Sequence, residues 1–320
     1  MSSRVGGAAV AAVGASLPAA VISSADIETR LGLSPDWIER RTGIRERRMA
    51  APDEHVNTHA TIAAERALAS AGIDPIQVDL LIAANTSPDE LLPNMAPMVA
   101  HALGARRAGA FDVGAACNGF LSALATGTSM IDSGRAACVV VVGADFMSRM
   151  LDQADRDTAA VFADGAGAVV LVATGEPSRV GPVVLGSEGD TEGIIRVTWE
   201  RPVIQMLGHE TFKIAVARLS QATQEAVAAA GLTFHDIDLF VYHQANGRIL
   251  TSVAERLGLN TDRVVDCIGE LGNTSAATLP LALEHSVRTG RLREGDRVLL
   301  AAFGAGFVWG ATVLEWGVPA

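Results

Sequence analysis

The chain contains an internal repeat. Residues 67–87 (ALASAGIDPIQVDLLIAANTS) align with residues 226–246 (AVAAAGLTFHDIDLFVYHQAN). This alignment, at an offset of 159 residues, places Gly72 on Gly231 and Asp79 on Asp238. Each copy predicts an alanine-rich helix, a glycine that ends the helix, a short loop and a hydrophobic strand, which is the order of elements in an α/β protein.

A second pair of stretches repeats in the same order. Residues 111–135 align with residues 267–291 at an offset of 156 residues, which places Cys117 on Asn273 and Gly134 on Gly290. In each copy we expect a strand, a tight turn, an amphipathic helix and then an apolar strand. Those apolar strands are expected at 138–145 and 297–306, and continuous Val, Leu and Ala runs of this kind suit strands that are covered on both faces.

The duplication predicts two similar α/β halves, residues 1–175 and 176–320, joined near 173–181. The composition is consistent with this prediction, because 49% of the residues are hydrophobic and only 4% are aromatic, so Ala, Val, Leu and Ile must form the core. Near the N-terminus, residues 4–18 resemble a signal peptide only superficially. The cap-like sequence SSAD at 23–26 favours a strand, a turn and a helix start there.

Charge and cysteine content exclude several classes of function. The formal net charge is −11, which argues against nucleic acid or an anionic membrane as the main partner. No uncharged apolar run reaches the roughly 18 residues that span a bilayer. The three cysteines form neither a disulfide framework nor a CxxC metal pair, so a reducing cytoplasm is expected.

The repeat also predicts which side chains can meet. Cys117 follows a strand at a turn into a helix, Asn273 occupies the matching turn of the other half, and His243 directly follows a strand. Ligands in such sheets collect at the carboxyl ends of strands. A pseudo-twofold relation between the halves would therefore bring a nucleophile, a base and an amide to one cleft. Taken alone, Asn273 could simply be a helix N-cap.

Cys117 is the best candidate for the nucleophile. A position at a helix N-terminus favours the thiolate, so we expect a lowered thiol pKa. The small residues around it would let a substrate carbonyl approach backbone N–H groups, as an oxyanion hole requires. Cys138 and Cys267 are interpreted as small buried hydrophobic residues. Gly304 and Gly306 could form a turn or a close approach to a ligand.

At these residues the sequence resembles the 3-oxoacyl-(acyl carrier protein) synthase III family, and the resemblance covers essentially the whole chain. The motifs that carry it are DWIERRTGIRERR (36–48), DVGAACNGF (112–120), FADGAGAVVL (162–171), HQANGRI (243–249), GNTSAAT (272–278) and FGAGFVWG (303–310). The resemblance implies the thiolase-like α/β fold, with two duplicated βαβαβαββ halves that form a five-layered αβαβα core. It also implies a homodimer and a catalytic triad of Cys117, His243 and Asn273.

The chemistry implied by the family suits these residue types. Cys117 would be acylated by acyl-CoA, with the backbone N–H groups of Cys117 and Ala305 as the oxyanion hole. A malonyl thioester, carried by CoA or by an acyl carrier protein, would then lose CO2. His243 and Asn273 would stabilise the resulting enolate, whose carbon attacks the acyl group to give a 3-oxoacyl thioester. This chemistry needs neither a metal nor a cofactor beyond the substrates.

The resemblance implies further roles for individual residues. The CoA and substrate site would comprise Trp37, Arg41, Arg156, Phe162, Gly208, Phe212 and Asn246, with Leu92 reaching the pocket of the partner subunit. Carrier-protein docking would fall to Lys213, Arg248 and Arg256. The segment 186–206 is shorter than in typical fatty-acid members, and it places Trp199 and Pro202 where the pocket wall is expected.

Three alternative functions are also considered for this sequence. The same scaffold could transfer an acyl group to an alcohol or amine in specialised metabolism, although the Asn273 amide favours condensation. A non-catalytic partner subunit could dispense with a nucleophile, so Cys117 argues against that alternative. A thiolase would need a second catalytic cysteine, for which the sequence offers no candidate. The sequence is compatible with more than one starter acyl group and with either a fatty-acid or a polyketide pathway.

Overall fold

The first half of the chain forms a mixed five-stranded sheet. The computed structural model describes residues 6–191 and 193–319, so the outermost residues of both predicted halves and residue 192 lie outside it. The strand order is β1-β7-β6-β4-β5. Its strands are β1 (Ala8–Ser16), β4 (Leu80–Ala84), β5 (Gly109–Val113), β6 (Cys138–Phe146) and β7 (Asp164–Ala173). β4 is parallel to β5 and β6, whereas β7 runs antiparallel to β1 and β6.

The second half repeats this arrangement with four strands in the order β11-β12-β13-β8. These are β8 (Val184–Ser187), β11 (Leu239–Tyr242), β12 (Arg297–Gly304) and β13 (Val308–Glu315). As in the first sheet, one pair is parallel (β11 and β12) and the next two are antiparallel. The strand order and directions therefore match β4-β6-β7-β1, which confirms the predicted duplication.

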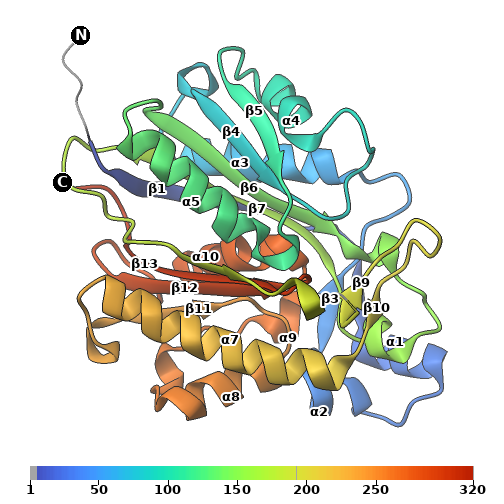
Figure 1. The fold of residues 1–320 in the computed structure, drawn as a ribbon. Helices are drawn as coiled ribbons and strands as arrows, with labels where there is room; N and C mark the ends of the chain where they lie inside the picture. The colour runs from blue at the N-terminus through green and yellow to red at the C-terminus, as the bar shows by residue number, and fades with distance from the viewer. Residues whose placement is uncertain (1–5, 192, 320) are drawn as a thin grey trace.

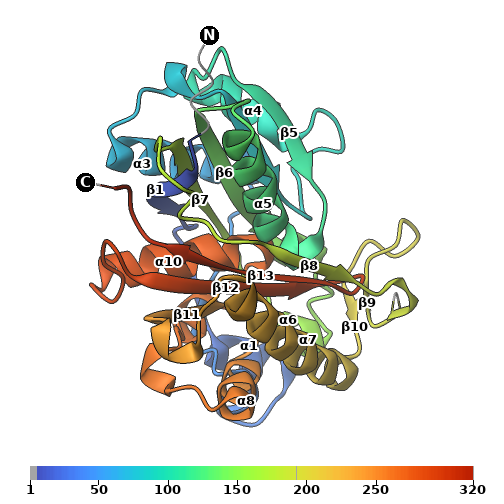
Figure 2. The same cartoon turned by 60° about the vertical axis from the view of Figure 1, so that its left-hand side comes forward.

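The two sheets and their helices form five layers (Figures 1 and 2). Helices α5 (Gly119–Asp132) and α10 (Thr278–Arg288) lie between the sheets, and each contacts strands of both. Helices α3 (Val56–Ala71) and α4 (Met95–Leu103) cover the outer face of the first sheet. Helices α7 (Gly208–Ala229) and α8 (Gly247–Leu257) form the layer outside the second sheet. The predicted αβαβα core is thus confirmed.

Equivalent residues of the two repeats play equivalent roles. The four aligned glycines, Gly72 with Gly231 and Gly134 with Gly290, all follow helices and have φ values of 66° to 71°. Their position past a helix end explains the choice of glycine, because other residues rarely adopt this left-handed conformation. The carboxylate of Asp79 accepts hydrogen bonds from Ala137 N and Cys138 N, at the start of β6.

Asp238 binds Arg297 N at the start of β12 in the same way, at 2.9 Å. Each repeated aspartate therefore ties the first residues of two neighbouring strands together. The duplication thus extends from the strand order to individual hydrogen bonds.

One expected strand is absent from the second sheet. The repeat predicts a strand before Asn273, but the described residues there hold only an isolated parallel bridge between Phe240 and Val264, followed by α9 (Ile268–Leu271). The side chain of Gln244 explains the difference. Its amide donates to Val265 O at 3.1 Å and accepts from Cys267 N at 3.0 Å, and so satisfies backbone groups that a longer strand would pair.

A smaller lobe lies at one end of the two sheets. It contains β2 (Val21–Ser23), β3 (Glu46–Arg48), α1 (Ser24–Leu31), α2 (Trp37–Thr42), α6 (Arg156–Ala159), β9 (Ile195–Arg196) and β10 (Gln205–Met206). Ser23 and Asp26 form a capping box at the start of α1, as the sequence SSAD predicts. β7 ends at Ala173 and β8 begins at Val184, so the predicted boundary lies in the connecting segment. The division into two domains stays a prediction.

Candidate active site

Cys117, His243 and Asn273 line one cavity of about 680 Å³. Cys117 lies just beyond β5, and His243 follows β11 directly. Asn273 lies two residues beyond α9, at the position that the repeat assigns to Cys117. The structure therefore brings together the three side chains that the duplication singles out, as expected for strand ends in two related sheets.

The turn that carries Cys117 has an unusual backbone. Ala116 has a φ of 45°, a left-handed conformation that is strained for alanine and recurs at functional sites. Gly272, which precedes Asn273, has a φ of 63° at the equivalent place. On the other side of the turn, a Cβ atom on Gly304 would lie 2.8 Å from Cys117 N. Only glycine lets the end of β12 come this close to the amide of Cys117.

The expected lowering of the Cys117 pKa is wrong for the free protein. The side chain is partly exposed, to the cavity, but the protein packed around it raises the pKa of the thiol to about 12. A nearby hydroxyl, that of Ser275, favours the thiolate, whereas the negative charge of Asp145 opposes it. The position beside a helix N-terminus does not compensate for desolvation of the charge. The thiol therefore carries its proton in the free protein, and a reaction at this sulfur would have to remove it.

His243 is available to receive that proton. Burial lowers the pKa of its imidazole to about 3, so the ring is neutral at physiological pH. Its Nδ1 atom lies 2.6 Å from the Oγ1 atom of Thr278. The ring of Phe303 packs edge-on against it, with a centroid distance of 5.2 Å. Thr278 occupies Nδ1, so Nε2 is the nitrogen left for a substrate.

The amide of Asn273 is oriented by the turn that follows it. Its Oδ1 atom accepts a hydrogen bond from Ser275 N at 2.9 Å. Its backbone pairs with the strand-like segment around Phe162, through bonds between Asn273 N and Val161 O (3.1 Å) and between Ala163 N and Asn273 O (2.9 Å). Because Oδ1 is occupied, the NH2 group is the part of this side chain that can donate to a substrate oxygen.

Aromatic and basic side chains line another part of the cavity. Trp37 is the first residue of α2, and the guanidinium carbons of Arg41 and Arg156 lie 4.3 and 5.7 Å from its ring centroid. Arg248 lies 5.8 Å from the ring of Phe212. All five residues line the cavity. This arrangement offers stacking and positive charge to a planar, anionic ligand.

The remaining residues predicted for this site also contact the cavity. Phe162, Gly208, Asn246 and Ala305 line it. Asn246 is in addition the N-cap of α8, where its side chain accepts from Arg248 N at 2.9 Å. The N-cap role and the binding role are compatible, because a capping side chain uses only one of its amide groups.

An apolar wall completes the cavity. Its residues are Met147, Val161, Phe162, Ile195, Val197, Ile204 and Met206. The expectation that Trp199 and Pro202 form this wall is wrong, because neither lines the cavity and Trp199 is 81% exposed. β9 and β10 place the flanking residues against the cavity and project the loop between them outward.

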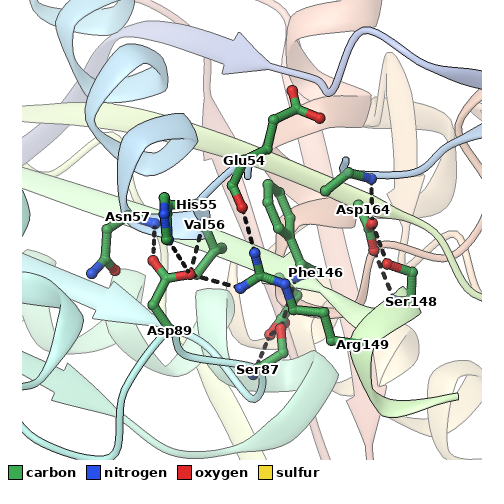
Figure 3. Close-up of polar contacts among 12 residues, drawn as sticks. Glu54, His55, Val56, Asn57, Ser87, Asp89, Phe146, Ser148, Arg149 and Asp164 are labelled. Atoms are coloured by element: carbon green, nitrogen blue, oxygen red, sulfur yellow. Dashed lines mark hydrogen bonds and ion pairs between the residues drawn. The ribbon is translucent and has the colours of Figure 1, made fainter. Parts of the chain in front are cut away.

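Leu92 does not line the cavity of its own chain and is 80% exposed. Its loop is anchored by Asp89, whose carboxylate accepts from Val56 N and Asn57 N and pairs with Arg149 at 2.7 Å (Figure 3). The expected contribution of Leu92 to a partner's pocket stays a prediction. Of the basic residues predicted for carrier docking, Arg248 lies at the cavity, whereas Lys213 on α7 and Arg256 on α8 are exposed outside it.

Sequence reasoning missed three residues that shape the site. Thr278 holds the imidazole of His243, Phe303 packs against that ring, and the buried Asp145 acts on the Cys117 thiol through its charge. Thr278 and Phe303 each stand in a quoted motif, GNTSAAT and FGAGFVWG, so the signal for them was present. Asp145 lies at the end of an apolar strand, and a single carboxylate at such a place carries no clear signal.

Two further properties concern the described residues as a whole. Within 6–191 and 193–319, no group of three or more His, Cys, Asp or Glu side chains could hold a metal ion. No helix in these ranges is both long and apolar enough to cross a membrane.

Comparison with known proteins agrees with this geometry. Residues 111–189 match the family model of 3-oxoacyl-[acyl-carrier-protein] synthase III, and residues 227–316 match the model of that enzyme's C-terminal region. The beta-ketoacyl-[acyl-carrier-protein] synthase III of Symbiobacterium thermophilum is 42% identical, over 96% of this chain and 98% of its own length. The chain belongs to the 3-oxoacyl-[acyl-carrier-protein] synthase III family.

Solved structures of the synthase III family have the same fold. The synthase III of Aquifex aeolicus superimposes with a TM-score of 0.93 at 37% identity, covering 97% of this chain and 100% of that one. The priming β-ketosynthase of the R1128 polyketide pathway gives a TM-score of 0.94 at 37% identity, covering 98% and 97%. The thiolase-like architecture expected from the sequence is therefore confirmed.

Proposed function

We propose that this protein is a priming ketosynthase. It takes an acyl group from acyl-CoA onto Cys117 and condenses that group with a malonyl thioester, releasing CO2 and a 3-oxoacyl thioester that starts a fatty-acid or polyketide chain. The observation that carries the proposal is the pairing of a cysteine with two oriented donors in one cavity. Nδ1 of His243 is bonded to Thr278, and Oδ1 of Asn273 accepts from Ser275 N. His243 Nε2 and the Asn273 NH2 group are therefore left for the substrate.

Acylation of Cys117 is the first step. The Cys117 sulfur bonds to the acyl carbon, and the bond from that carbon to the CoA sulfur breaks. The thiol proton passes through His243 to the departing CoA thiolate. Because burial disfavours charge on both Cys117 and His243, proton transfer accompanies attack rather than preceding it. The N–H groups of Cys117 and Ala305 bind the tetrahedral oxygen.

Condensation is the second step. The bond between the malonyl carbon and its carboxylate breaks, CO2 leaves, and the electron pair passes into an enolate. His243 Nε2, in the tautomer whose Nδ1 accepts from Thr278 Oγ1, and the Asn273 NH2 group donate to the enolate oxygen, and preorganised donors of this kind stabilise charge as it develops. The enolate carbon then bonds to the acyl carbon, the bond from that carbon to the Cys117 sulfur breaks, and the thiolate takes up a proton. No step requires a metal.

The aromatic and basic residues of the cavity suit CoA. We assign Trp37 and the guanidinium groups of Arg41 and Arg156 to the adenine, and Phe212 and Asn246 to the pantetheine arm. The net charge of −11 opposes any anionic partner, so binding depends on this local cluster of arginines and should weaken with salt. Lys213, Arg248 and Arg256 extend the basic surface, and we assign them to an acidic carrier protein.

We further propose a homodimer located in the cytoplasm. β5 is the last strand of its sheet, so one of its edges is free to pair with a second copy. The exposed apolar residues Leu91, Leu92 and Phe111 suit burial against that copy. The three free cysteines suit a reducing compartment.

One experiment tests the chemistry. The protein is incubated with acyl-CoA thioesters of increasing chain length, and the mass of the intact protein is measured before and after addition of malonyl-CoA or malonyl carrier protein. We expect an acyl adduct on Cys117 that disappears only with a malonyl thioester, together with a 3-oxoacyl product. Discharge of the adduct by an alcohol or amine, without CO2, would instead indicate simple acyl transfer.

A further inference from the structure

A buried carboxylate lies next to the reacting groups and has no role in the chemistry above. Asp145 is the penultimate residue of β6, at the carboxyl end of the strand, and is completely buried. Its Oδ1 atom accepts hydrogen bonds from Thr86 N (2.6 Å), Ser87 N (2.9 Å) and Ser87 Oγ (2.9 Å). These residues belong to the loop that follows β4, in which Thr86 lines the cavity.

The other carboxylate oxygen reaches the second half of the chain. Asp145 Oδ2 accepts from Ala276 N at 3.1 Å, in the turn that follows Asn273. β6 touches this turn directly, because a Cβ atom on Gly143 would lie 2.4 Å from Ala276 O. One carboxylate therefore joins a loop of the first half to a turn of the second half. Burial raises the pKa of this carboxyl, but all four of its partners donate hydrogen bonds to it, which favours the ionised form.

The turn at 275–277, which Asp145 holds through Ala276 N, sets the geometry of Asn273. Ser275, whose N–H binds Asn273 Oδ1, has a φ of 53°, a conformation that serine rarely adopts without support. The hydrogen bond from the next residue, Ala276, to Asp145 supplies such support. The turn at 275–277 also packs against residues 116–118, which carry Cys117, and the negative charge of Asp145 disfavours the thiolate there. Asp145 thus acts on two of the three reacting residues without lining the cavity.

We propose that Asp145 is a positioning residue of this active site, which holds the Asn273 amide in its donating orientation and, through the same turn, restrains the reactivity of the Cys117 thiol. The part of this inference that concerns Asn273 rests on the proposed condensation. The part that concerns Cys117 does not, because the state of a thiol can be measured without any substrate.

The test uses Asp145→Asn, which removes the charge with little change in size. The matched control is Asp164→Asn. Asp164 is a second buried carboxylate on the neighbouring strand β7, where it accepts from Ala50 N (2.7 Å) and Ser148 N (2.8 Å) (Figure 3). Among the described residues it accepts hydrogen bonds of the same kind, but none of them comes from the turn at 275–277. The two variants therefore share the general cost of losing a buried carboxylate.

The first measurement is alkylation of Cys117 by iodoacetamide between pH 7 and 9, followed by peptide mapping. We expect Asp145→Asn to react about threefold faster or more at each pH, because removal of the negative charge favours the thiolate. The control should react like the wild type. Equal rates in all three proteins, or equal acceleration in both variants, would overturn the effect of Asp145 on the reactivity of Cys117.

The second measurement is CO2 release from a malonyl thioester by the acylated enzyme. We expect Asp145→Asn to lower the rate about tenfold, and to lower it no further when Asn273→Ala is already present, since residues that act through each other are not additive. Additive losses would overturn the link to Asn273. If Asp145→Asn is insoluble, Asp145→Ser replaces it in both measurements. If neither variant folds while Asp164→Asn does, Asp145 acts in folding and the proposal fails.

Discussion

The Nδ1 atom of His243 and the Oγ1 atom of Thr278 are separated by 2.6 Å, across a gap of 35 residues in the sequence. Thr278 is the first residue of α10, the central-layer helix of the second half, and His243 follows β11. This contact fixes which nitrogen of the imidazole is left for the cavity. It makes α10 part of the catalytic geometry as well as of the core.

Removing the hydroxyl of Thr278 should impair catalysis more than folding. We expect Thr278→Val, which keeps the size of the side chain, to lower the rate of 3-oxoacyl product formation about tenfold, the effect of losing one hydrogen bond of about 1.4 kcal/mol. Steady-state kinetics provides the measurement. Thr312→Val is the control, because Thr312 is a buried threonine that bonds Gly181 O at 3.1 Å and does not line the cavity. Equal losses in both variants would contradict the role of Thr278.

The proposed role of Cys117 as the nucleophile can be tested by measuring the mass of the intact protein. We expect Cys117→Ala to form no acyl-enzyme with any acyl-CoA, because neither buried thiol, Cys138 nor Cys267, lines the cavity. Intact-protein mass spectrometry checks this prediction, with Cys138→Ala as the control that keeps the adduct. An adduct of unchanged yield on Cys117→Ala would refute the assignment.

The side-chain amide of Asn273 should matter for condensation but not for acylation of Cys117. We expect Asn273→Ala to acylate Cys117 but to lose CO2 release by about a hundredfold, which is the cost of removing one donor to a developing oxyanion. The two steps are measured separately, by intact mass and by release of labelled CO2. Equal loss of acylation and of CO2 release would contradict the division of roles.

The tryptophan at the basic end of the cavity should govern CoA affinity. We expect Trp37→Ala to raise KM for acyl-CoA about tenfold while kcat changes little, because stacking and cation–π contacts bind a part of the ligand that does not react. Trp199→Ala is a matched control, since Trp199 is exposed and does not line the cavity. An effect of Trp199→Ala as large as that of Trp37→Ala would indicate that the adenine binds elsewhere.

The buried imidazole should make the fold sensitive to acid. The pKa of His243 is about 3 in the folded protein and near 6.5 once the chain unfolds. Between these values the unfolded chain binds a proton that the folded protein does not, so this residue's contribution to stability falls as the pH drops from about 6.5 to 3. We expect His243→Gln to lose less thermal stability than the wild type over this range. Parallel curves of Tm against pH would contradict the lowered pKa of His243, because a residue whose pKa is the same in both states adds no dependence of stability on pH.

Much of the architecture could be predicted from local patterns. The glycines that end helices, the aspartates that tie strand starts together and the apolar strands all repeat at offsets of 156 and 159 residues. Turns and caps depend on a few neighbouring residues, so they can be read along the chain. The repeat also predicted that Cys117, His243 and Asn273 share one cavity, because the strand ends of two related sheets meet.

The expected fifth strand of the second half was wrong for a reason that local patterns do not contain. A side-chain amide, that of Gln244, satisfies the backbone groups of Val265 and Cys267 in its place. The expected pocket wall failed in a similar way. Trp199 is apolar, but the short hairpin of β9 and β10 turns it toward solvent, and no spacing rule shows which side of a loop faces a cavity.

The duplicated fold and the meeting of Cys117, His243 and Asn273 in one cavity could be predicted from the sequence alone, because they follow from periodic patterns and from residues at the ends of strands. The tertiary structure alone decided the raised pKa of Cys117, the orientation of His243 by Thr278 and the hydrogen bonds of Asp145. Each of these depends on how much water surrounds a group or on contacts between residues 35 or more positions apart. A helix N-terminus favours a thiolate locally, but in this fold the desolvation imposed by the surrounding protein is the larger effect.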